Sequence, residues 1–226
     1  MIKHIIRPYI AKRQAEINFL NRARLKNKDI SLICSNCIGG IIYHSLGLRF
    51  NSPFINLYMT GEDYIKALEN WQDFLGTEIV EDTTEIKPYP IGVGYLGIKV
   101  HFLHYAMFDE AIEKWNRRKV RVKADNIAFM FDYAGGDMSL LERFDRLPFE
   151  HKVVFTADKC PNIKSAVCLK GYKNYCRLCR LYKKFTKKNW SPNIWMMQNR
   201  ITGKRFIDQF DYVSWFNSIS SESDEC

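Results

Sequence analysis

Apolar residues along this chain follow two alternating spacings. Short runs that are mainly apolar and rich in β-branched or aromatic residues are typical of strands buried on both faces. Such runs occur at residues 29–34, 98–103, 127–131 and 152–156. Between them, the apolar positions of residues 61–75 and 108–123 recur three or four residues apart, which is typical of amphipathic helices. This alternation predicts an α/β fold with a mostly parallel sheet flanked by helices, a Rossmann-like arrangement of three layers.

Capping signals predict where several helices begin and end. A short helix over residues 41–47 is expected to end at Gly47. Thr60 is suited to cap the N-terminus of the helix that follows it. Ser139 and Glu142 have the spacing of a capping box, which predicts that Ser139 caps the next helix.

The chain divides into a basic N-terminal segment, residues 1–28, and a longer body. Four apolar residues of this segment recur at roughly helical spacing: Ile10, Ile17, Leu20 and Leu25. An amphipathic helix is therefore expected over residues 8–28, either packed on the body or resting on an anionic membrane. We expect residues 29–217 to form a single α/β domain, and the polar, acidic residues 218–226 to be disordered.

Composition and charge narrow the class of protein. Of the 226 residues, 46% are hydrophobic, enough to build a core without a metal or disulfide. Neither a transmembrane run nor a secretory signal is found, so we expect a cytoplasmic protein, free or peripheral at the inner face of the membrane. The formal net charge is +9, and the cations gather in residues 1–28, 114–123 and 170–188. Such a surface attracts polyanions, including phosphate-bearing donors such as an acyl-coenzyme A or a nucleotide-sugar.

The seven cysteines are an odd number in a chain without a secretory signal, so reduced thiols are expected. Cys176 and Cys179 have the spacing of half a zinc site, but Cys160 and Cys168 are too far apart to supply the other half. We therefore expect no metal and no tightly bound cofactor. The basic and aromatic residues 170–195 contain no nucleic-acid-binding motif, so nucleic acid is not an expected partner.

The strongest candidate for chemistry is the turn between the first predicted strand and the helix after it. Its residues are Ser35, Asn36, Cys37, Ile38, Gly39 and Gly40. Ligands of α/β sheets bind at the carboxyl ends of strands, and a helix N-terminus there favours negative charge. Cys37 is thus a candidate nucleophile. Alternatively, the backbone of the turn, which Gly39 and Gly40 leave open to a ligand, is a candidate phosphate cradle. The alternative is that Cys37 is a small buried apolar residue.

Two histidines near the end of the run 98–103 are candidate general bases. On a strand, His101 and His104 would point to opposite faces, so one of them is expected at any given site. We favour His104 because it lies further toward the carboxyl end. A structural, hydrogen-bonded histidine is the alternative for either.

Other polar residues could bind the substrates. Arg117 and Arg118 could clamp phosphates, and Asn116 could donate to a sugar hydroxyl, although a solvated helix end would show the same pattern. Asp132 follows a predicted strand, where a carboxylate could orient a histidine or bind a sugar.

Six segments, taken together and in order, are similar to a bacterial family, the domain of unknown function 1919. They are Ser35–Gly40, Asn51–Phe54, Tyr89–Gly92, His101–Tyr105, Lys114–Arg118 and Phe144–Phe149. The resemblance implies an α/β domain that works on exopolysaccharide or capsular polysaccharide, alongside glycosyltransferases. Where members more usually have Ser-Asn-Asn-Cys, this chain has Cys34-Ser35-Asn36-Cys37. The Asn-Cys turn also resembles that of a capsule-associated family of acetyltransferases.

These observations favour a transferase that modifies a sugar or glycan of a surface polysaccharide. An O-acyltransferase using acetyl-coenzyme A is the leading hypothesis, with Cys37 or the turn backbone engaging the acyl group and a histidine deprotonating the acceptor hydroxyl. A glycosyltransferase using a nucleotide-sugar is the alternative enzyme, although no convincing Asp-x-Asp motif is present. A non-catalytic scaffold of the polysaccharide machinery is the third hypothesis.

Overall fold

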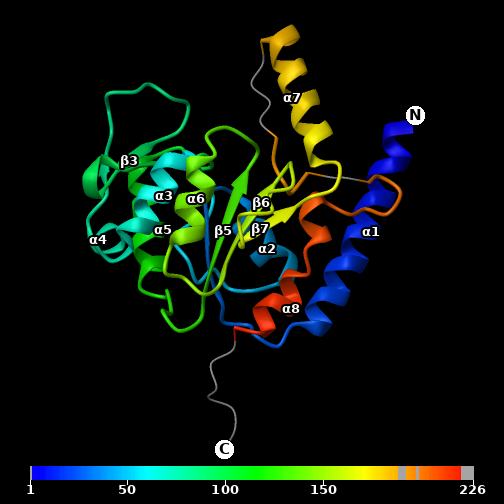
Figure 1. Cartoon of the computed structure of the whole chain (residues 1–226), viewed down its shortest axis with the longest axis horizontal. Coiled ribbons are helices and arrows are strands. Elements are labelled where there is room, and N and C mark those ends of the chain that lie inside the picture. Colours follow the sequence, from blue (N-terminus) through cyan, green and yellow to red (C-terminus); the bar gives the residue numbers. More distant parts are fainter. Residues whose placement is uncertain (1, 188–191, 197–198, 220–226) are drawn as a thin grey trace, which may run out of the picture.

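A parallel sheet lies at the centre of the computed structural model, which describes residues 2–187, 192–196 and 199–219 (Figure 1). Within these residues the sheet has the strand order β1-β5-β6-β7. The strands are β1 (Ser31–Cys34), β5 (Ile127–Tyr133), β6 (Lys152–Thr156) and β7 (Ala166–Cys168). Every pairing in this order is parallel, so the predicted α/β fold with a parallel sheet is confirmed.

Successive residues of the strands point to opposite faces of the sheet and build two separate cores. Leu32 and Met130 lie in one buried cluster, whereas Ile33 and Phe131 lie in the other. This period of two is the normal side-chain geometry of a strand. Because both faces are covered, the strands read as continuous apolar runs in the sequence.

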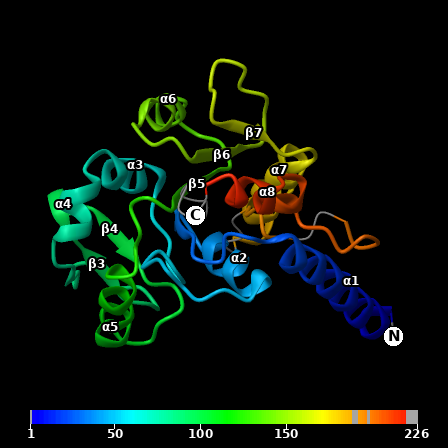
Figure 2. The ribbon, with the colours of Figure 1, turned by 90° about the horizontal axis from the view of Figure 1, so that it is seen from below.

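Helices cover both faces of the sheet, as Figure 2 shows from below. One face packs against α3 (Gly61–Glu69), α4 (Trp71–Gly76), α5 (Phe108–Lys119) and α6 (Ser139–Arg146). The other packs against α2 (Ile38–Leu46), the base of α7 (Tyr172–Thr186) and α8 (Tyr212–Asn217), with α1 (Ile2–Arg24) outside them. Gly47 ends α2 in the left-handed conformation, as predicted. The single helix expected over 61–75 is divided in two at Asn70.

A second, small sheet lies beside the first and is antiparallel. It contains β2 (Val80–Glu81), β3 (Ile91–Val93) and β4 (Lys99–His101). The prediction that residues 98–103 form a strand of the parallel sheet is therefore wrong. The reason is local: a tight turn at residues 95–97, where Gly97 has a φ of 73°, folds β4 back onto β3.

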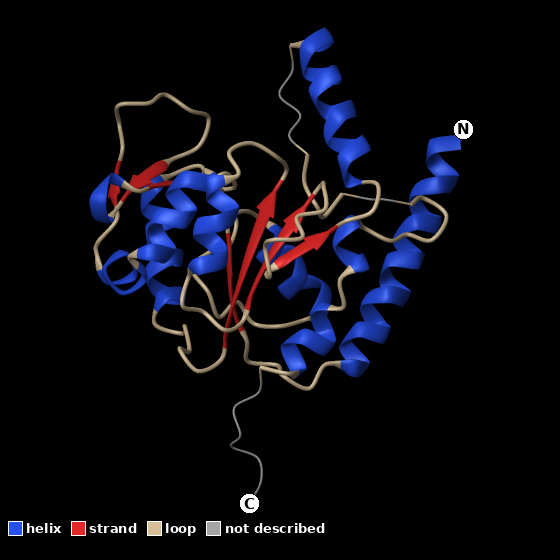
Figure 3. Cartoon of the chain, viewed as in Figure 1, coloured by secondary structure: helices blue, strands red, loops and turns tan. Residues whose placement is uncertain are grey.

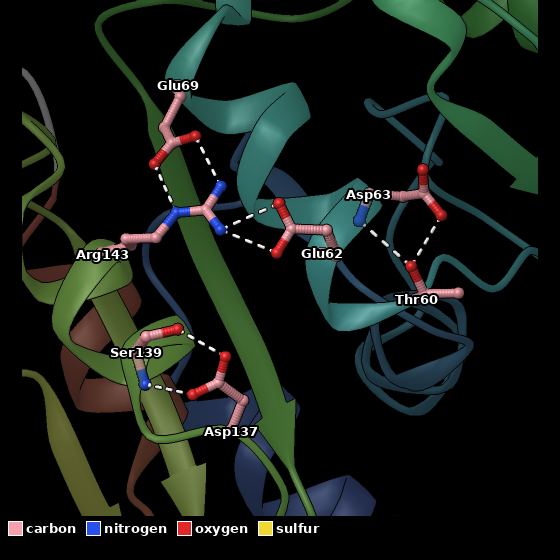
Figure 4. Close-up of polar contacts among 7 residues, drawn as sticks. All are labelled: Thr60, Glu62, Asp63, Glu69, Asp137, Ser139 and Arg143. Carbon is pink, nitrogen blue, oxygen red and sulfur yellow. Dashed lines mark hydrogen bonds and ion pairs between the residues drawn. The ribbon is translucent and has the colours of Figure 1, made fainter.

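Capping and ion pairs fix α3 against α6 (Figure 4). The Thr60 hydroxyl accepts a hydrogen bond from the backbone N–H of Asp63, which confirms the predicted cap. The prediction for Ser139 is wrong, because it is the first residue of α6 and its N–H donates to the carboxylate of Asp137. The N-cap residue is Met138, and the carboxylate of Asp137 just before it accepts from both the N–H and the hydroxyl of Ser139.

The N-terminal helix packs on the domain through polar contacts as well as apolar ones. Asn21 donates to the hydroxyl of Tyr212 at 3.0 Å, and Arg22 donates to the carbonyl of Ser45 at 2.8 Å. Leu20, one of the four apolar residues used to predict this helix, is 61% exposed, whereas Leu25 is buried just beyond its end. At the other terminus the core extends to the buried Ile219, and residues 220–226 of the predicted tail lie outside the described residues.

None of the helices formed by the described residues combines the length and apolar character that a bilayer crossing needs.

Candidate active site

The turn after β1 is fixed by hydrogen bonds at the carboxyl edge of the sheet. The Asn36 side chain, one residue before the N-cap Cys37, accepts from the N–H of Ile38, the first residue of α2, at 3.1 Å. The amide of the same side chain donates to Asp132 at the end of β5, also at 3.1 Å. The Ser35 carbonyl accepts from the N–H of Met59 at 2.9 Å. Asn36 and Ser35 therefore position the turn and hold Cys37 at the start of α2.

Cys37 meets His104 at this turn. The distance between the Cys37 sulfur and Nε2 of His104 is 3.3 Å, which is within hydrogen-bonding range for a thiol. Cys37 is 9% exposed, whereas the His104 ring lies at the surface. The sulfur also lies 3.6 Å from the carbonyl oxygen of Leu57. We call Cys37 and His104 the dyad, since a nucleophile within reach of a base is the basic unit of covalent catalysis.

The segment 55–59 joins the two sheets and sets the dyad distance. Tyr58 and His101 exchange two backbone hydrogen bonds of 2.8 and 2.9 Å, which tie this segment to β4. Its next residue, Met59, is bonded to Ser35 at the end of β1. His104 follows β4 in a tight turn, in which the N–H of Tyr105 donates to the Phe102 carbonyl. The two halves of the dyad are thus held by one continuous set of backbone bonds.

Burial controls the protonation of the Cys37 thiol. Loss of solvent raises its pKa to about 11, since the apolar surroundings disfavour the thiolate. The neighbouring Cys34 is completely buried, and burial raises its pKa still further. At neutral pH Cys37 is therefore a thiol, and a base must accept its proton during any nucleophilic attack. His104 is in place to be that base.

The dyad lies in a cavity of about 780 Å³, which we call the dyad cavity. It is bounded by α1, α2 and the segments that contain Phe50, Asn56, Trp195 and Arg205. Its lining residues are Ala11, Gln14, Ala15, Asn18, Cys37, Gly40, Ile41, His44, Ser45, Phe50, Asn56, His104, Trp195 and Arg205. This volume accommodates a small molecule.

Amide side chains provide much of the polar lining of the dyad cavity. Gln14 and Asn18 come from one face of α1, and Asn56 comes from segment 55–59, where its φ of 62° is left-handed. The side-chain oxygen of Asn18 is buried and accepts no hydrogen bond from the described residues. A buried acceptor without a donor is unfavourable, so this oxygen is suited to a ligand hydroxyl or amine.

The two glycines of the turn have different roles. A Cβ on Gly39 would lie 2.9 Å from the sulfur of Cys34, so this position is glycine because α2 packs closely on β1. Gly40 lines the dyad cavity, and a Cβ there would lie 3.4 Å from Ile55. Gly40 is thus the glycine whose backbone a ligand can approach.

Asp132 lies at the same edge of the sheet but is bonded to groups other than His104. Its carboxylate accepts from Asn36 at 3.1 Å and from the hydroxyl of Tyr172 at 3.0 Å. Desolvation raises its pKa to about 6, against the opposing effect of these two bonds. Asp132 and Asn36 line a separate cavity of about 300 Å³. Asp132 therefore supports the turn through Asn36, and the prediction that it orients a histidine is wrong.

The structure places His101 away from the dyad. Its ring packs between the rings of Tyr58 and Tyr89, with centroid distances of 5.7 and 5.9 Å. Burial lowers its pKa, which favours the neutral imidazole. The strand ends at His101, so His104 lies in a turn and the argument from alternating strand faces does not apply to it. Of the two candidate bases, the geometry brings His104 to Cys37.

The predicted phosphate clamp on α5 is not formed. Arg118 is buried, donates to the Tyr105 hydroxyl at 3.0 Å and lies 5.1 Å from the ring centre of Phe50. Arg117 is exposed and pairs with Glu113 on the same helix, and Asn116 is exposed as well. Arg118 reaches the dyad cavity only indirectly, by supporting Phe50 in its wall.

Sequence reasoning missed the α1 side of the cavity. Ala11, Gln14, Ala15 and Asn18 share one helical face by their spacing, but their small or polar side chains gave no apolar signal. Among the described residues, no group of three or more His, Cys, Asp or Glu side chains is arranged to hold a metal.

The fold and the site together define an α/β protein with a Cys–His pair at the carboxyl edge of its parallel sheet. The chain belongs to the family described as Domain of unknown function (DUF1919), which matches residues 9–217. It is 37% identical over 203 residues to an uncharacterized protein of Haemophilus influenzae, with 88% of this chain and 91% of that protein covered.

Proposed function

We propose that this protein is a transferase that uses Cys37 and His104 to move an acyl group from an acyl-coenzyme A to a hydroxyl of a sugar or glycan. The observation that carries the proposal is the 3.3 Å contact between the Cys37 sulfur and His104 Nε2 inside a cavity of about 780 Å³. A thiol beside an imidazole is suited to covalent acyl transfer.

In the first half-reaction the Cys37 sulfur attacks the thioester carbonyl of the donor while His104 accepts the thiol proton. The bond from the carbonyl carbon to the donor sulfur breaks, and His104 returns the proton to the departing coenzyme A thiolate. The raised pKa of Cys37 makes this transfer to His104 necessary. Negative charge on the carbonyl oxygen develops near the N-terminus of α2, where the helix dipole is favourable.

In the second half-reaction the acceptor hydroxyl attacks the acyl group on Cys37, and His104 accepts the hydroxyl proton. The thioester bond to Cys37 breaks and the proton returns to its sulfur. The balance is one acyl group moved from thiol to hydroxyl, with the protein unchanged. Splitting the reaction in two lets donor and acceptor occupy the same cavity in turn.

A sugar acceptor suits the lining of the dyad cavity. Gln14, Asn18 and Asn56 offer amide groups that both donate and accept, which matches the paired hydroxyls of a sugar. Trp195 adds an aromatic wall for the apolar face of a sugar ring. The resemblance to proteins of exopolysaccharide and capsular polysaccharide biosynthesis supports the same acceptor class. With an acyl-coenzyme A as donor, the protein would work in the cytoplasm.

The non-catalytic scaffold has less support, because a scaffold needs neither a reactive pair nor a cavity around it. A glycosyltransferase using a nucleotide-sugar also has less support, since glycosyl transfer does not call for a cysteine thiol beside a histidine.

Intact mass after incubation with acetyl-coenzyme A tests the proposal. We expect one acetyl adduct, mapped to Cys37 and removable with hydroxylamine, because a thioester is labile to that nucleophile. Cys168→Ala is the matched control, since Cys168 is an exposed thiol away from the cavity, and it should acylate normally. Cys37→Ala should give no adduct, and His104→Ala should slow its formation by about a hundredfold or more.

Absence of an adduct with acetyl-coenzyme A and with longer acyl-coenzyme A donors would overturn the proposal, as would an adduct that persists in Cys37→Ala. Acceptor binding is tested separately with Asn56→Gly. Glycine adopts the left-handed conformation of residue 56 without strain, so this variant removes the side-chain amide and leaves the backbone as it is. This variant should acylate at Cys37 and transfer the acyl group to a sugar acceptor more slowly.

A further inference from the structure

The helix α7 projects from the body of the molecule, with its C-terminal end furthest away (Figure 1). Its base is anchored, since Tyr172, Cys176 and Cys179 are buried. The secondary-structure view shows the same projection (Figure 3). A helix that leaves the body in this way presents most of its surface to whatever lies beyond it.

One face of α7 is apolar and exposed. Leu178, Leu181, Tyr182 and Phe185 follow the spacing i, i+3, i+4, i+7, so they form a single stripe along the helix. Their exposed fractions are 61%, 41%, 39% and 80%, respectively. Phe185, near the free end, is the most exposed of the four. We call these four residues the α7 stripe.

Most of the other exposed residues of α7 are cationic. Its 15 residues contain no Asp or Glu and include five cations, namely Lys173, Arg177, Arg180, Lys183 and Lys184. At about 100° per residue these cations lie on the side of the helix away from the α7 stripe. Lys173 pairs with Asp158, and the other four form no ion pair with the described residues.

We propose that α7 is a docking helix for an anionic lipid surface. An apolar stripe segregated from a cationic face is the pattern of a helix that lies in the membrane interface. The stripe would enter the boundary between headgroups and acyl chains, while the cations would contact anionic headgroups. Charge complementarity identifies the occupant, because the four cations of α7 that form no ion pair with the described residues match a negatively charged surface.

Two other occupants fit the same helix less well. A second copy of this chain, paired through the α7 stripe, would cover the apolar residues but leave the cations of both helices without anions. A nucleic acid would require cations and stacking aromatic rings on a shared face, whereas here Phe185 and the cations are on different sides. The proposal is independent of the chemistry at Cys37.

The structure also distinguishes α7 from α1, the other basic helix. Arg22 and Arg24 of α1 are bonded to Ser45 and Asp211 on the body. The exposed Phe19 of α1, at 70%, nevertheless resembles Phe185 in size and exposure. Phe19 therefore provides a matched control on a different helix.

Co-sedimentation of the full chain with vesicles tests the proposal. We expect binding to equimolar phosphatidylcholine and phosphatidylglycerol, no binding to phosphatidylcholine alone, and weaker binding as salt rises. The double variant Leu181→Ser/Phe185→Ser should bind the anionic vesicles at least about tenfold more weakly. Lys183→Glu/Lys184→Glu should also lose binding, while Phe19→Ser should bind as the wild type does. All these side chains are exposed except the half-exposed Leu181, and circular dichroism checks that each variant is folded.

Three results would overturn the proposal. One is equal binding of the wild type to neutral and anionic vesicles. Another is a loss in Phe19→Ser as large as that in Leu181→Ser/Phe185→Ser. The third is an absence of vesicle binding by the wild type. In that case, a change of self-association in the stripe variants, measured by sedimentation velocity, would indicate a second copy of the chain as the occupant. A change in their binding of single-stranded RNA would indicate a nucleic acid.

Discussion

The sulfur of Cys37 and Nε2 of His104 lie 3.3 Å apart although 67 residues separate them in the chain. Cys37 follows β1 of the parallel sheet, and His104 follows β4 of the antiparallel sheet. Segment 55–59, which is hydrogen bonded to both sheets, helps to hold the pair together.

The first prediction concerns the alkylation of Cys37 by iodoacetamide. Burial raises its pKa to about 11, so the fraction of thiolate should grow about tenfold per pH unit from neutral pH to about pH 10. Peptide mapping isolates Cys37 from the other thiols, and a small free thiol serves as the reference. A rate that is already constant at about pH 8 would contradict the prediction, since it would indicate a thiolate–imidazolium pair in the resting protein.

The second prediction concerns Asp132 and pH. Its pKa is raised from 3.8 to about 6, so the folded protein retains this proton at pH values where the unfolded chain has lost it. The protonated Asp132 therefore stabilises the fold most at low pH. As the pH rises from about 4 to about 6, its contribution to the free energy of unfolding falls by an amount on the order of 3 kcal/mol. Asp132→Asn can still accept from Asn36 through its oxygen, while its amide can donate to the Tyr172 oxygen with the direction of that bond reversed. The variant should abolish this fall and be more stable than the wild type at neutral pH.

Urea unfolding between pH 4 and 7 measures the effect of Asp132→Asn on the free energy of unfolding. Asp137→Asn is the control of opposite sign, because the hydrogen bonds from Ser139 lower the pKa of Asp137. Its carboxylate stabilises the fold above its ordinary pKa, so Asp137→Asn should lower stability at neutral pH. If the two variants shift stability in the same direction at neutral pH, the interpretation of Asp132 is wrong.

The third prediction concerns the close packing of α2 on β1. A Cβ at position 39 would lie 2.9 Å from the sulfur of Cys34, so Gly39→Ala should destabilise the fold by about 1–3 kcal/mol. Gly76→Ala is the control, since no atom lies within 4 Å of the Cβ there and its φ is ordinary, and it should have little effect. Adding Cys34→Ala to Gly39→Ala should recover part of the loss, and a purely additive double-mutant cycle would refute the clash.

The fourth prediction concerns Arg143, which pairs with Glu69 at 2.8 Å and Glu62 at 2.7 Å and so joins α6 to α3 (Figure 4). Arg143→Lys keeps the charge but loses the planar fork, so we expect a loss of about 1 kcal/mol that shrinks at high salt. The exposed pair of Arg146 and Glu142, at 4.0 Å, is the control, and Arg146→Lys should have no measurable effect. Equal losses in both variants would show that the fork geometry does not matter.

The sequence predicted those parts of the fold that depend on local patterns. The run Lys152–Thr156 is buried and apolar, and it is the strand β6 with the predicted bounds. Gly47 and Thr60 carry unambiguous capping chemistry: Gly47 ends α2 and Thr60 caps the start of α3, as expected. Residues 98–103 have the same apolar character as a parallel strand, so their pairing with β3 through a hairpin could not be distinguished from composition.

The candidate site was predictable only in part. Cys37 was identified because it follows a strand and begins a helix, which are both local signals. Its contact with His104 depends on long-range bonds of segment 55–59, for which residue types give no signal. The amide lining from Gln14 and Asn18 was missed for a related reason, since polar residues on a helix face normally indicate solvent.

The division of the dyad between two sheets has a consequence for inactivation by heat. Local opening releases the least stable units of a protein first, and the small antiparallel sheet is held by short strands and a few backbone bonds. When it separates from the parallel sheet, His104 leaves Cys37, and Val100 and Phe102 leave the core that they share with Phe131. The other core, around Leu32 and Met130, remains intact. Acylation of Cys37 should therefore fail at a lower temperature than that at which the helical circular dichroism is lost. The rate of acylation would then report whether the two sheets are still in contact.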